Sequence, residues 1–147
     1  MNLELKQIGV IHSPYKVSDG MPIQPPFSKE TGEVEVFKGY EAGLKDLEGF
    51  SHIIILYLFH DSGGYKAHVR PYLDNNPRGL FATRAPWRPN PIGLSIVKLM
   101  EMGGNILEVE GIDVLDGTPL LDIKPYVPEF DWRENVRIGW LEGKVRK

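Results

Sequence analysis

Short runs in which polar and apolar residues alternate are the main secondary-structure signal of this chain. Alternating runs, or continuous β-branched and aromatic runs, occur at 4–12, 33–37, 52–59, 92–102, 106–112 and 120–124. Successive side chains of a strand point to opposite faces, so alternation predicts strands with one buried face. The run HIIILYLF at 52–59 is apolar after its first residue, and it predicts a central strand buried on both faces.

Turn-forming residues separate these runs. Gly103-Gly104-Asn105 predicts a hairpin turn, and DGTP at 116–119 predicts a second turn. A short helix is expected over 40–47, ending at Gly49, and the tail at 132–147 fits either a last strand pair or a short helix. About seven strand candidates and one or two short helices predict a mainly β fold, an antiparallel barrel or sandwich. The chain shows no βαβ alternation, repeat or linker, so we expect a single domain over 1–147.

Two proline-rich segments are candidate functional loops. Residues 13–28 contain four prolines, and long loops of this kind are often functional. Residues 79–95 read GLFATRAPWRPNPIGLS, in which Ala85, Arg88 and Asn90 each precede a proline and are therefore held extended. A stiff loop carrying arginine, tryptophan and asparagine side chains loses less entropy when a ligand binds. A loop that only connects two strands is the alternative.

Composition narrows the classes of function. The chain has 147 residues, 41% of them hydrophobic, and it contains no cysteine, which excludes disulfides, thiolate catalysis and cysteine-ligated zinc. No run is long enough to span a membrane and no signal-peptide pattern is present, so a cytoplasmic location is expected. The net charge is −3, yet the segment from His60 to Arg88 carries five cations against two carboxylates. Such a segment can hold a polyanion, although a merely solvated surface is an equal alternative.

The remaining chemical signals are weaker. QPPF at 24–27 approaches the loop of adenine methyltransferases but begins with Gln24 and lacks a Rossmann pattern, so that relationship is rejected. The four histidines are scattered; His60 and His68 could ligate a metal with Asp61, but their spacing is not diagnostic and we expect no metal. Standard phosphate loops are absent, and Ser13, Ser51 and Ser95 show no local catalytic partner. Asp122, Lys124 and Tyr126 lie on one face of a predicted strand, as acid/base machinery or as a solvated, salt-bridged face.

Two long signatures resemble those of a known family. GLFATRAPWRPNPIGLS at 79–95 and DVLDGTPLLDIKPYVP at 113–128, together with Gly20, Pro22, Gln24 and Phe59-His60, are similar to the TsaA/TrmO (YaeB-like) family. The resemblance runs from the first strand to about Asp131. It implies an S-adenosylmethionine-dependent tRNA methyltransferase, built on a single antiparallel β-barrel and working as a homodimer. The implied substrate is the amino nitrogen of threonylcarbamoyl-adenosine beside the anticodon.

Carried over position by position, the resemblance assigns residues to the cofactor. The implied S-adenosylmethionine contacts are Ile23, Gln24, Pro25, His60, Asp61, Arg84, Leu94, Leu115, Asp116, Gly117 and Thr118. Family members commonly have Gln or Glu where this chain has Asp61. An arginine pairs with carboxylates through two parallel hydrogen bonds, so Arg84 is expected to hold the cofactor's carboxylate, while backbone groups of the turn at 116–118 read its polar edges.

The catalytic and RNA contacts are hypotheses built on this resemblance. Asp122 or Tyr126 is expected to act as the base, with Lys124 tuning its pKa and Asn90 holding the base edge. Trp87 or Phe130 is expected to stack on a splayed anticodon-loop base, and the expected phosphate contacts are Lys66, Arg70, Arg78 and Arg88. Two alternatives stay open: a non-catalytic RNA-binding barrel, and a methyltransferase acting on another substrate.

Overall fold

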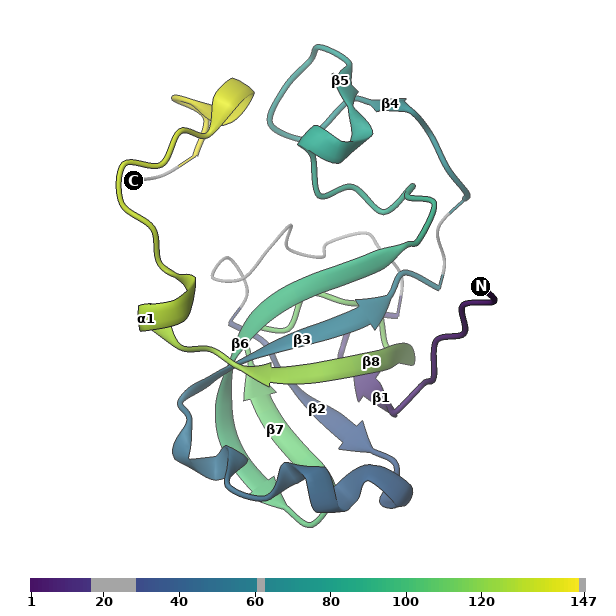
Figure 1. The fold of residues 1–147 in the computed structure, drawn as a ribbon, viewed down its shortest axis with the longest axis vertical. Helices are drawn as coiled ribbons and strands as arrows, with labels where there is room; N and C mark the ends of the chain where they lie inside the picture. The colour runs from purple at the N-terminus through teal and green to yellow at the C-terminus, as the bar shows by residue number, and fades with distance from the viewer. Residues whose placement is uncertain (17–28, 61–62, 146–147) are drawn as a thin grey trace.

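The centre of the molecule is a closed antiparallel barrel of six strands (Figure 1). A computed structural model describes residues 1–16, 29–60 and 63–145. The strands follow one another around the barrel as β1 (Gly9–His12), β2 (Thr31–Val36), β7 (Ile106–Glu110), β6 (Ile92–Gly103), β3 (His52–Leu58) and β8 (Thr118–Pro125). The mainly β, antiparallel fold predicted from the alternating runs is confirmed, with six strands in the barrel rather than about seven.

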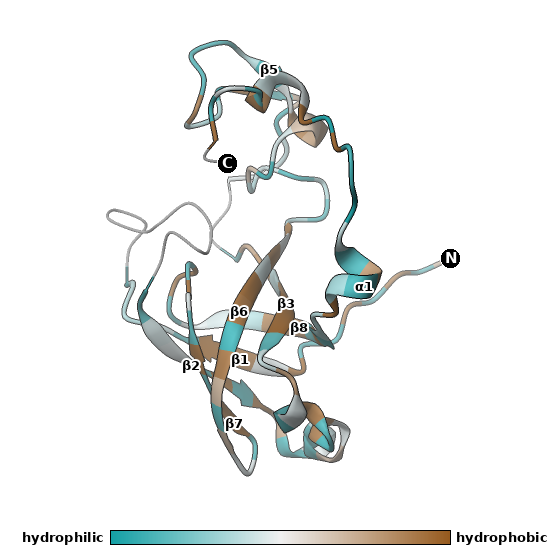
Figure 2. Ribbon diagram, turned by 90° about the vertical axis from the view of Figure 1, so that its left-hand side faces the viewer, coloured by the Kyte–Doolittle hydropathy of each residue, from teal (hydrophilic) through white to brown (hydrophobic). Residues whose placement is uncertain are grey.

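Alternation along the strands fills the barrel interior. Buried inward side chains include Ile11, Val34, Ile53, Val97 and Leu107, each at most 1% exposed. The prediction that the strand at 52–59 is buried on both faces was wrong, because Ile54, Leu56 and Leu58 on the outer side of β3 are only half-buried. Figure 2 shows the hydrophobic colour along much of β3 and β6. The unbroken apolar run therefore reflects a core face and a second, partly exposed apolar face.

The two ends of the barrel differ in what they carry. At the loop end, β3, β1 and β7 finish and β6, β2 and β8 begin, so the connections 13–30, 59–91 and 111–117 all leave from this end. The hairpin end carries the tight β6–β7 turn, where Gly104 has a φ of 60°, a conformation that favours glycine. It also carries the expected helix, which is a pair of 3₁₀ turns, η1 (Lys38–Leu44) and η2 (Leu47–Gly49), whose Leu44 and Leu47 join the core.

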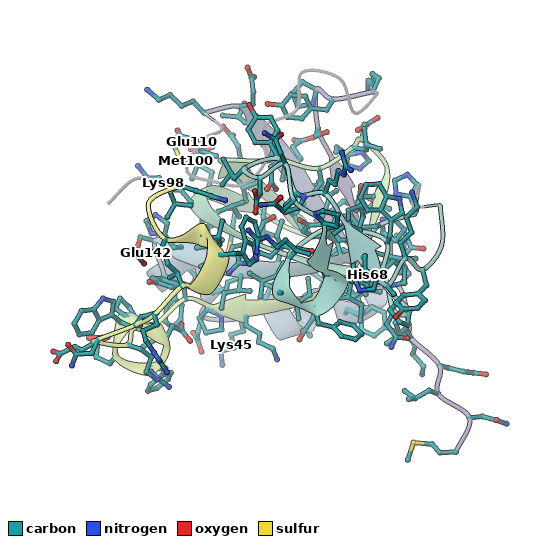
Figure 3. The ribbon with its side chains drawn as sticks, turned by 90° about the horizontal axis from the view of Figure 1, so that it is seen from above. Lys45, His68, Lys98, Met100, Glu110 and Glu142 are labelled. Atoms are coloured by element: carbon teal, nitrogen blue, oxygen red, sulfur yellow. The ribbon has the colours of Figure 1, made fainter. Side chains whose placement is uncertain are left out.

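Two register shifts interrupt the barrel ladders. One lies between β3 and β8, where Leu56 pairs with Asp122 but Tyr57 pairs with Leu120. The other lies between β6 and β7, near Met100. Figure 3 labels Lys98 and Met100 on β6 and Glu110 on β7 along one side of the molecule, and Lys98 pairs with Glu110 across the two strands. Bulges of this kind bend a strand and re-aim its side chains.

A separate small unit forms within the long connection 59–91. It consists of the two-stranded ribbon β4 (His68–Val69) and β5 (Arg78–Gly79), followed by the 3₁₀ turn η3 (Leu80–Ala82). In Figure 1 this unit lies above the barrel, beside the end of the C-terminal tail. Leu80 is 1% exposed although it belongs to a loop excursion.

The described part of the C-terminal tail, up to residue 145, forms no strand pair, and its regular structure is limited to short helical turns. It begins with the single α-helical turn α1 (Pro128–Asp131), and it ends with η4 (Gly139–Leu141). The Trp140 indole Nε1 donates to the Ala82 carbonyl at 2.8 Å, and the Lys144 ammonium lies 3.1 Å from the Asp74 carboxylate. The tail thus packs on the ribbon unit. In the part of the chain that the structure describes, no helix is long and apolar enough to cross a membrane.

Candidate active site at the loop end of the barrel

Most of the expected cofactor residues in the described chain gather at the loop end. His60 follows β3 by two residues, Arg84 precedes β6, and Leu115–Thr118 close the connection into β8. His60 and Arg84 are both exposed. The antiparallel pairing of the barrel brings these distant segments to one end. The other expected contacts, Ile23, Gln24, Pro25 and Asp61, lie outside the described residues.

The turn at 115–118 is held by hydrogen bonds, which its amides donate to carbonyls of the same chain. The Thr118 amide donates to the Leu115 carbonyl at 3.3 Å, and Gly117 between them has a φ of 84°, as a type II turn requires. The amides of Asp116 and Gly117 donate to the carbonyls of Tyr15 and Ile11 at 2.7 and 2.9 Å. Since these three amides bond within the protein, the carbonyls of the turn are the backbone groups that stay as candidates for reading a ligand's polar edges.

Asp116 fastens this turn to the segment after β1. Its two carboxylate oxygens accept from the Ser13 amide at 2.9 Å and the Lys16 ammonium at 2.6 Å. The Lys16 hydrogen bond, followed by that of the Ser13 amide, holds the pKa of Asp116 below its usual range. His12 lies 3.9 Å from the same carboxylate and 2.9 Å from Glu35. Asp116 is therefore an ionised anchor in this structure, and its side chain ties two loop bases together.

Three polar side chains form a buried chain of hydrogen bonds just inside the loop end. The Ser95 hydroxyl donates to Asp113 Oδ1 at 2.7 Å, and Tyr57 Oη lies 2.8 Å from Ser95 Oγ. A serine hydroxyl has one proton, so with Ser95 donating to Asp113 the Tyr57 hydroxyl must donate to Ser95. Ser95 is fully buried, and Tyr57 and Asp113 are 2% and 6% exposed.

Burial sets the electrostatics of this chain. It raises the pKa of Asp113 to about 6, against the opposing hydrogen bonds from Ser95 and from the Asp113 amide. Burial and the Asp113 charge also raise the pKa of Tyr57 well above its usual range, while the hydrogen bond with Ser95 and the positive charge of Arg84 oppose this shift. The sequence did not indicate Tyr57 or Asp113 as site residues and showed no local partner for Ser95, because the residues that bond are 38 and 18 positions apart. A serine at the centre of an apolar strand was the available signal.

Gly93 makes room for the Tyr57 ring. A Cβ at this position would lie 2.7 Å from Tyr57 Cζ and 2.8 Å from Phe59 Cζ. The two rings meet edge to face, with centroids 5.5 Å apart, and the Phe59 amide donates to the Pro91 carbonyl at 2.7 Å. The glycine of the motif PNPIGLS is thus required for close packing beneath the loops that carry His60 and Arg84.

The outer face of the barrel brings Leu94 and Asp122 into one row. Leu94 of β6 pairs with Leu56 of β3, and Leu56 pairs with Asp122 of β8. Neighbouring strands lie about 4.8 Å apart, so the Leu94 and Asp122 backbones are separated by about 10 Å. The bulge at Leu121 produces this arrangement, because without it Asp122 would point into the core with Leu120.

Asp122 and Lys124 share the outer face of β8, as predicted, whereas Tyr126 lies just beyond the end of this strand. Lys124 Nζ lies 2.9 Å from Asp122 Oδ2, and the two side chains are 60% and 44% exposed. The Tyr126 ring meets the His52 ring edge to face at 6.4 Å, near the hairpin end. From Asp122 to Tyr126, the three residues of one chain therefore lie progressively farther from the loop end and closer to the hairpin end. Asn90, by contrast, is exposed at the start of β6, and its carbonyl accepts from the Ile92 amide.

The expected RNA contacts divide into exposed and engaged side chains. Arg70 is exposed, and the Lys66 ammonium lies 4.5 Å from the centre of the Trp87 ring. Arg88 instead donates to the carbonyls of Thr83 and Ala85, both at 2.9 Å, and braces its own loop.

Arg78 is the most strongly engaged cation of this set. Its Nε donates to Asp74 at 2.6 Å, and its guanidinium lies over the Trp140 ring. Desolvation of Asp74 opposes ionisation, but hydrogen bonds from Arg78, the Asn76 amide and Lys144 prevail and hold the pKa of Asp74 below its usual range. Because Arg78 is paired with a carboxylate that is 6% exposed, it holds the ribbon unit together in this structure.

A shallow surface depression also exists at the opposite end of the molecule. It is lined by residues of η1 and of the β6–β7 turn, among them Lys38, Glu41 and Met102. None of the expected site residues lies in its lining, so the depression does not coincide with the loop end.

Comparison with known proteins places this geometry in a family. The sequence model of the tRNA-methyltransferase O N-terminal domain matches residues 10–132. A probable S-adenosyl-L-methionine-binding protein of Pyrococcus abyssi is 58% identical over 143 residues, covering 97% of this chain and 78% of that protein. The tRNA (adenine(37)-N6)-methyltransferase of Escherichia coli is 44% identical over 138 residues, covering 86% of this chain and 59% of that protein.

A solved structure agrees with the sequence comparisons. The crystal structure of TrmO superimposes with a TM-score of 0.82 at 39% identity, covering 95% of this chain and 64% of that one. The barrel and the loops that leave its loop end fall within the matched region. The chain therefore belongs to the tRNA-methyltransferase O N-terminal domain family, as its two motifs predicted.

Proposed function

We propose that this protein transfers a methyl group from S-adenosylmethionine to the amino nitrogen of an adenine in tRNA. Relatives named as S-adenosyl-L-methionine-binding proteins and as tRNA (adenine(37)-N6)-methyltransferases support the proposal. The observation that carries it is the convergence of His60, Arg84 and the 115–118 turn at one end of the barrel. The finer substrate that we propose is threonylcarbamoyl-adenosine beside the anticodon. A cytoplasmic location is part of the same proposal, because it fits a tRNA substrate.

The residues at the loop end suit the cofactor's chemistry. The exposed Arg84 offers the planar pair of N–H donors that a carboxylate accepts. Leu94, 40% exposed, offers an apolar contact close to the start of β6. The cofactor supplies a methyl group on a positively charged sulfur, so the protein need not activate the donor. The protein's main tasks are then to align the donor with the acceptor nitrogen and to exclude water.

Proton removal is the second task of the chain. The acceptor nitrogen must lose a proton during or after attack, and Asp122 is our proposed base, with Tyr126 as the alternative. The Lys124 ammonium forms a salt bridge with the Asp122 carboxylate at 2.9 Å. Asn90, exposed just before β6, is our proposed residue for holding a base edge, because its amide group can both donate and accept. Exposed cations of the ribbon unit, Arg70 foremost, are the proposed phosphate contacts.

A second copy of the chain is the proposed occupant of the outer face. Three consecutive outward side chains of β6, Ile92, Leu94 and Ile96, are 38%, 40% and 37% exposed. They continue across β3 through the half-buried Ile54 and Leu56. An exposed apolar patch of this kind marks an interaction site. Because Asp122 borders this patch beside Leu56, a homodimer formed here would place one chain's Asp122 beside its partner.

Calorimetric titration with S-adenosylmethionine tests the donor site first. Wild-type protein should show saturable binding that Arg84→Ala abolishes, because the carboxylate contact is lost. Arg133→Ala is the matched control, since the Arg133 guanidinium donates to the tail carbonyls of Phe130 and Trp132, far from β6 in sequence. Absence of binding by folded wild-type protein would leave a non-catalytic RNA-binding barrel as the better reading.

The homodimer is tested by light scattering on a sizing column. Ile96→Glu places a charge in the proposed interface and should convert a dimer to a monomer. Glu101→Lys, a charge change at an exposed position near the far end of the same strand, should leave the mass unchanged. A monomeric wild-type protein, or a dimer that tolerates Ile96→Glu, would contradict this assignment of the patch.

A further inference from the structure

The buried chain Tyr57–Ser95–Asp113 joins the bases of the loops that carry the proposed cofactor site. Tyr57 lies one residue before the end of β3, Ser95 lies three residues after the start of β6, and Asp113 belongs to the β7–β8 connection. Each of the two hydrogen bonds therefore crosses between segments that are 38 or 18 residues apart in sequence. Backbone pairing alone joins β3 to β6, but it does not join either strand to Asp113.

The position of each polar group argues against simple core filling. Ser95 is fully buried between the inward neighbours Gly93 and Val97, where an alanine or valine would pack without a hydroxyl to satisfy. Burying Asp113 disfavours its ionised form, and two partners satisfy its polar atoms: the Ser95 hydroxyl and its own amide. A network that is fully satisfied makes a core rigid and selects one arrangement.

The hydrogen-bonded network of Tyr57, Ser95 and Asp113 lies next to the residues of the proposed cofactor site. The Tyr57 ring fills the space left by Gly93 and meets Phe59 edge to face, and His60 is the next residue. The positive charge of Arg84 acts on the Tyr57 hydroxyl, so this arginine lies within electrostatic range of the network. Asp113 precedes the 115–118 turn by two residues, and Asp116 in that turn holds Ser13 and Lys16.

We propose that Tyr57, Ser95 and Asp113 form a positioning unit that fixes the loops carrying His60, Arg84 and Asp116 before the cofactor arrives. The unit rests on the proposed function for its purpose, but its mechanical role does not require the cofactor. Its residues act through the loops and are not placed in contact with substrate. Prior ordering lowers the entropy lost on binding, so the unit should raise affinity for the cofactor.

Amide hydrogen exchange on the unliganded protein tests the mechanical role. The reporters are the Phe59 amide, bonded to Pro91, and the Asp116 amide, bonded to Tyr15. Ser95→Ala removes both hydrogen bonds of the network and should speed exchange at both reporters by about tenfold, the effect expected from losing hydrogen bonds of this kind. Asp113→Ala should act alike, whereas Asp113→Asn retains an acceptor oxygen for Ser95 and should stay near wild type.

Val97→Ala is the matched control for general loosening of the barrel. Val97 is the next inward residue of β6, it is 1% exposed, and it has no polar atom in its side chain. Val97→Ala should lower the midpoint of unfolding, but it should not speed exchange at the Phe59 and Asp116 amides more than at other amides. Equal exchange at Phe59 and Asp116 in Ser95→Ala and wild type, or an effect no larger than that of Val97→Ala, would overturn the positioning unit.

Titration with S-adenosylmethionine then tests the link to function. Ser95→Ala should raise the dissociation constant at least about fivefold. Adding Tyr57→Phe to Ser95→Ala should raise the dissociation constant no further, because the hydrogen bond between Tyr57 and Ser95 is already lost. Asp113→Asn should bind nearly as wild type. If wild-type protein binds no cofactor while the exchange results hold, the proposed function fails and the positioning unit stands. If wild type binds and Ser95→Ala binds equally well, the assigned purpose of the unit fails.

Discussion

Replacing Asp113 with asparagine should make the protein more stable at neutral pH but not at acid pH. Burial raises the pKa of Asp113 in the folded protein to about 6, from an ordinary value of 3.8. Because the folded state holds this proton more tightly than the unfolded state does, the stabilisation from protonation is complete below pH 3.8. It is lost as the pH rises through 6.

The size of the effect follows from the two pKa values. Each pKa unit corresponds to 1.36 kcal/mol, so an ionised Asp113 lowers the free energy of unfolding by about 3 kcal/mol relative to its neutral form. Asparagine keeps an oxygen that accepts from Ser95 and cannot ionise. Asp113→Asn should therefore match wild type near pH 4 and exceed it by about 3 kcal/mol above pH 7.

Urea unfolding at a series of pH values between 4.5 and 7.5 measures this difference. Subtracting wild type from Asp113→Asn cancels the titration of all other groups, provided both unfold in one step. Val97→Ala provides a control that does not titrate and should cost about 2 kcal/mol at every pH. A difference between Asp113→Asn and wild type that stays constant across this range would show that Asp113 does not titrate with a raised pKa in the folded protein.

Three further changes follow from the packing and the charges. Gly93→Ala should lower the free energy of unfolding by about 1–3 kcal/mol in urea titrations, because its Cβ would collide with the Tyr57 ring. Trp140→Ala removes the hydrogen bond to Ala82 and two cation contacts, so limited trypsin digestion should cut the tail faster. Arg70→Ala should weaken tRNA binding and reduce the slope of log affinity against log salt by about 1, measured by filter binding.

Each of these predictions has a matched control. Gly39→Ala adds its Cβ where nothing lies within 4 Å, and an equal loss of stability there would remove the steric explanation for Gly93. Trp132→Ala is the control for Trp140→Ala, because the Trp132 side chain is 62% exposed. Equal trypsin sensitivity of these two variants would contradict the contact between Trp140 and the ribbon unit. Arg78→Ala should chiefly destabilise the ribbon unit, because Arg78 is paired with Asp74. An unchanged salt slope in Arg70→Ala would exclude its phosphate contact.

The site was partly visible in the sequence. The motifs at 79–95 and 113–128 carried Arg84 and the 115–118 turn, and the barrel places both at its loop end. Strand alternation also put Asp122 and Lys124 on one face. Sequence could not show that the amides of the turn are already bonded, because their acceptors, Tyr15 and Ile11, lie about 100 residues earlier.

The barrel strands, most of their inward faces and the family could be predicted from the chain alone, because these depend on local alternation and on contiguous motifs. The other features depend on how the strands and loops come together. The bulge at Leu121 turns Asp122 outward, barrel closure brings Tyr57, Ser95 and Asp113 together, and the tail reaches Asp74 through Lys144. Each of these depends on contacts between segments that are distant in the chain, and the periodicity of a single segment carries no information about which segment it will meet.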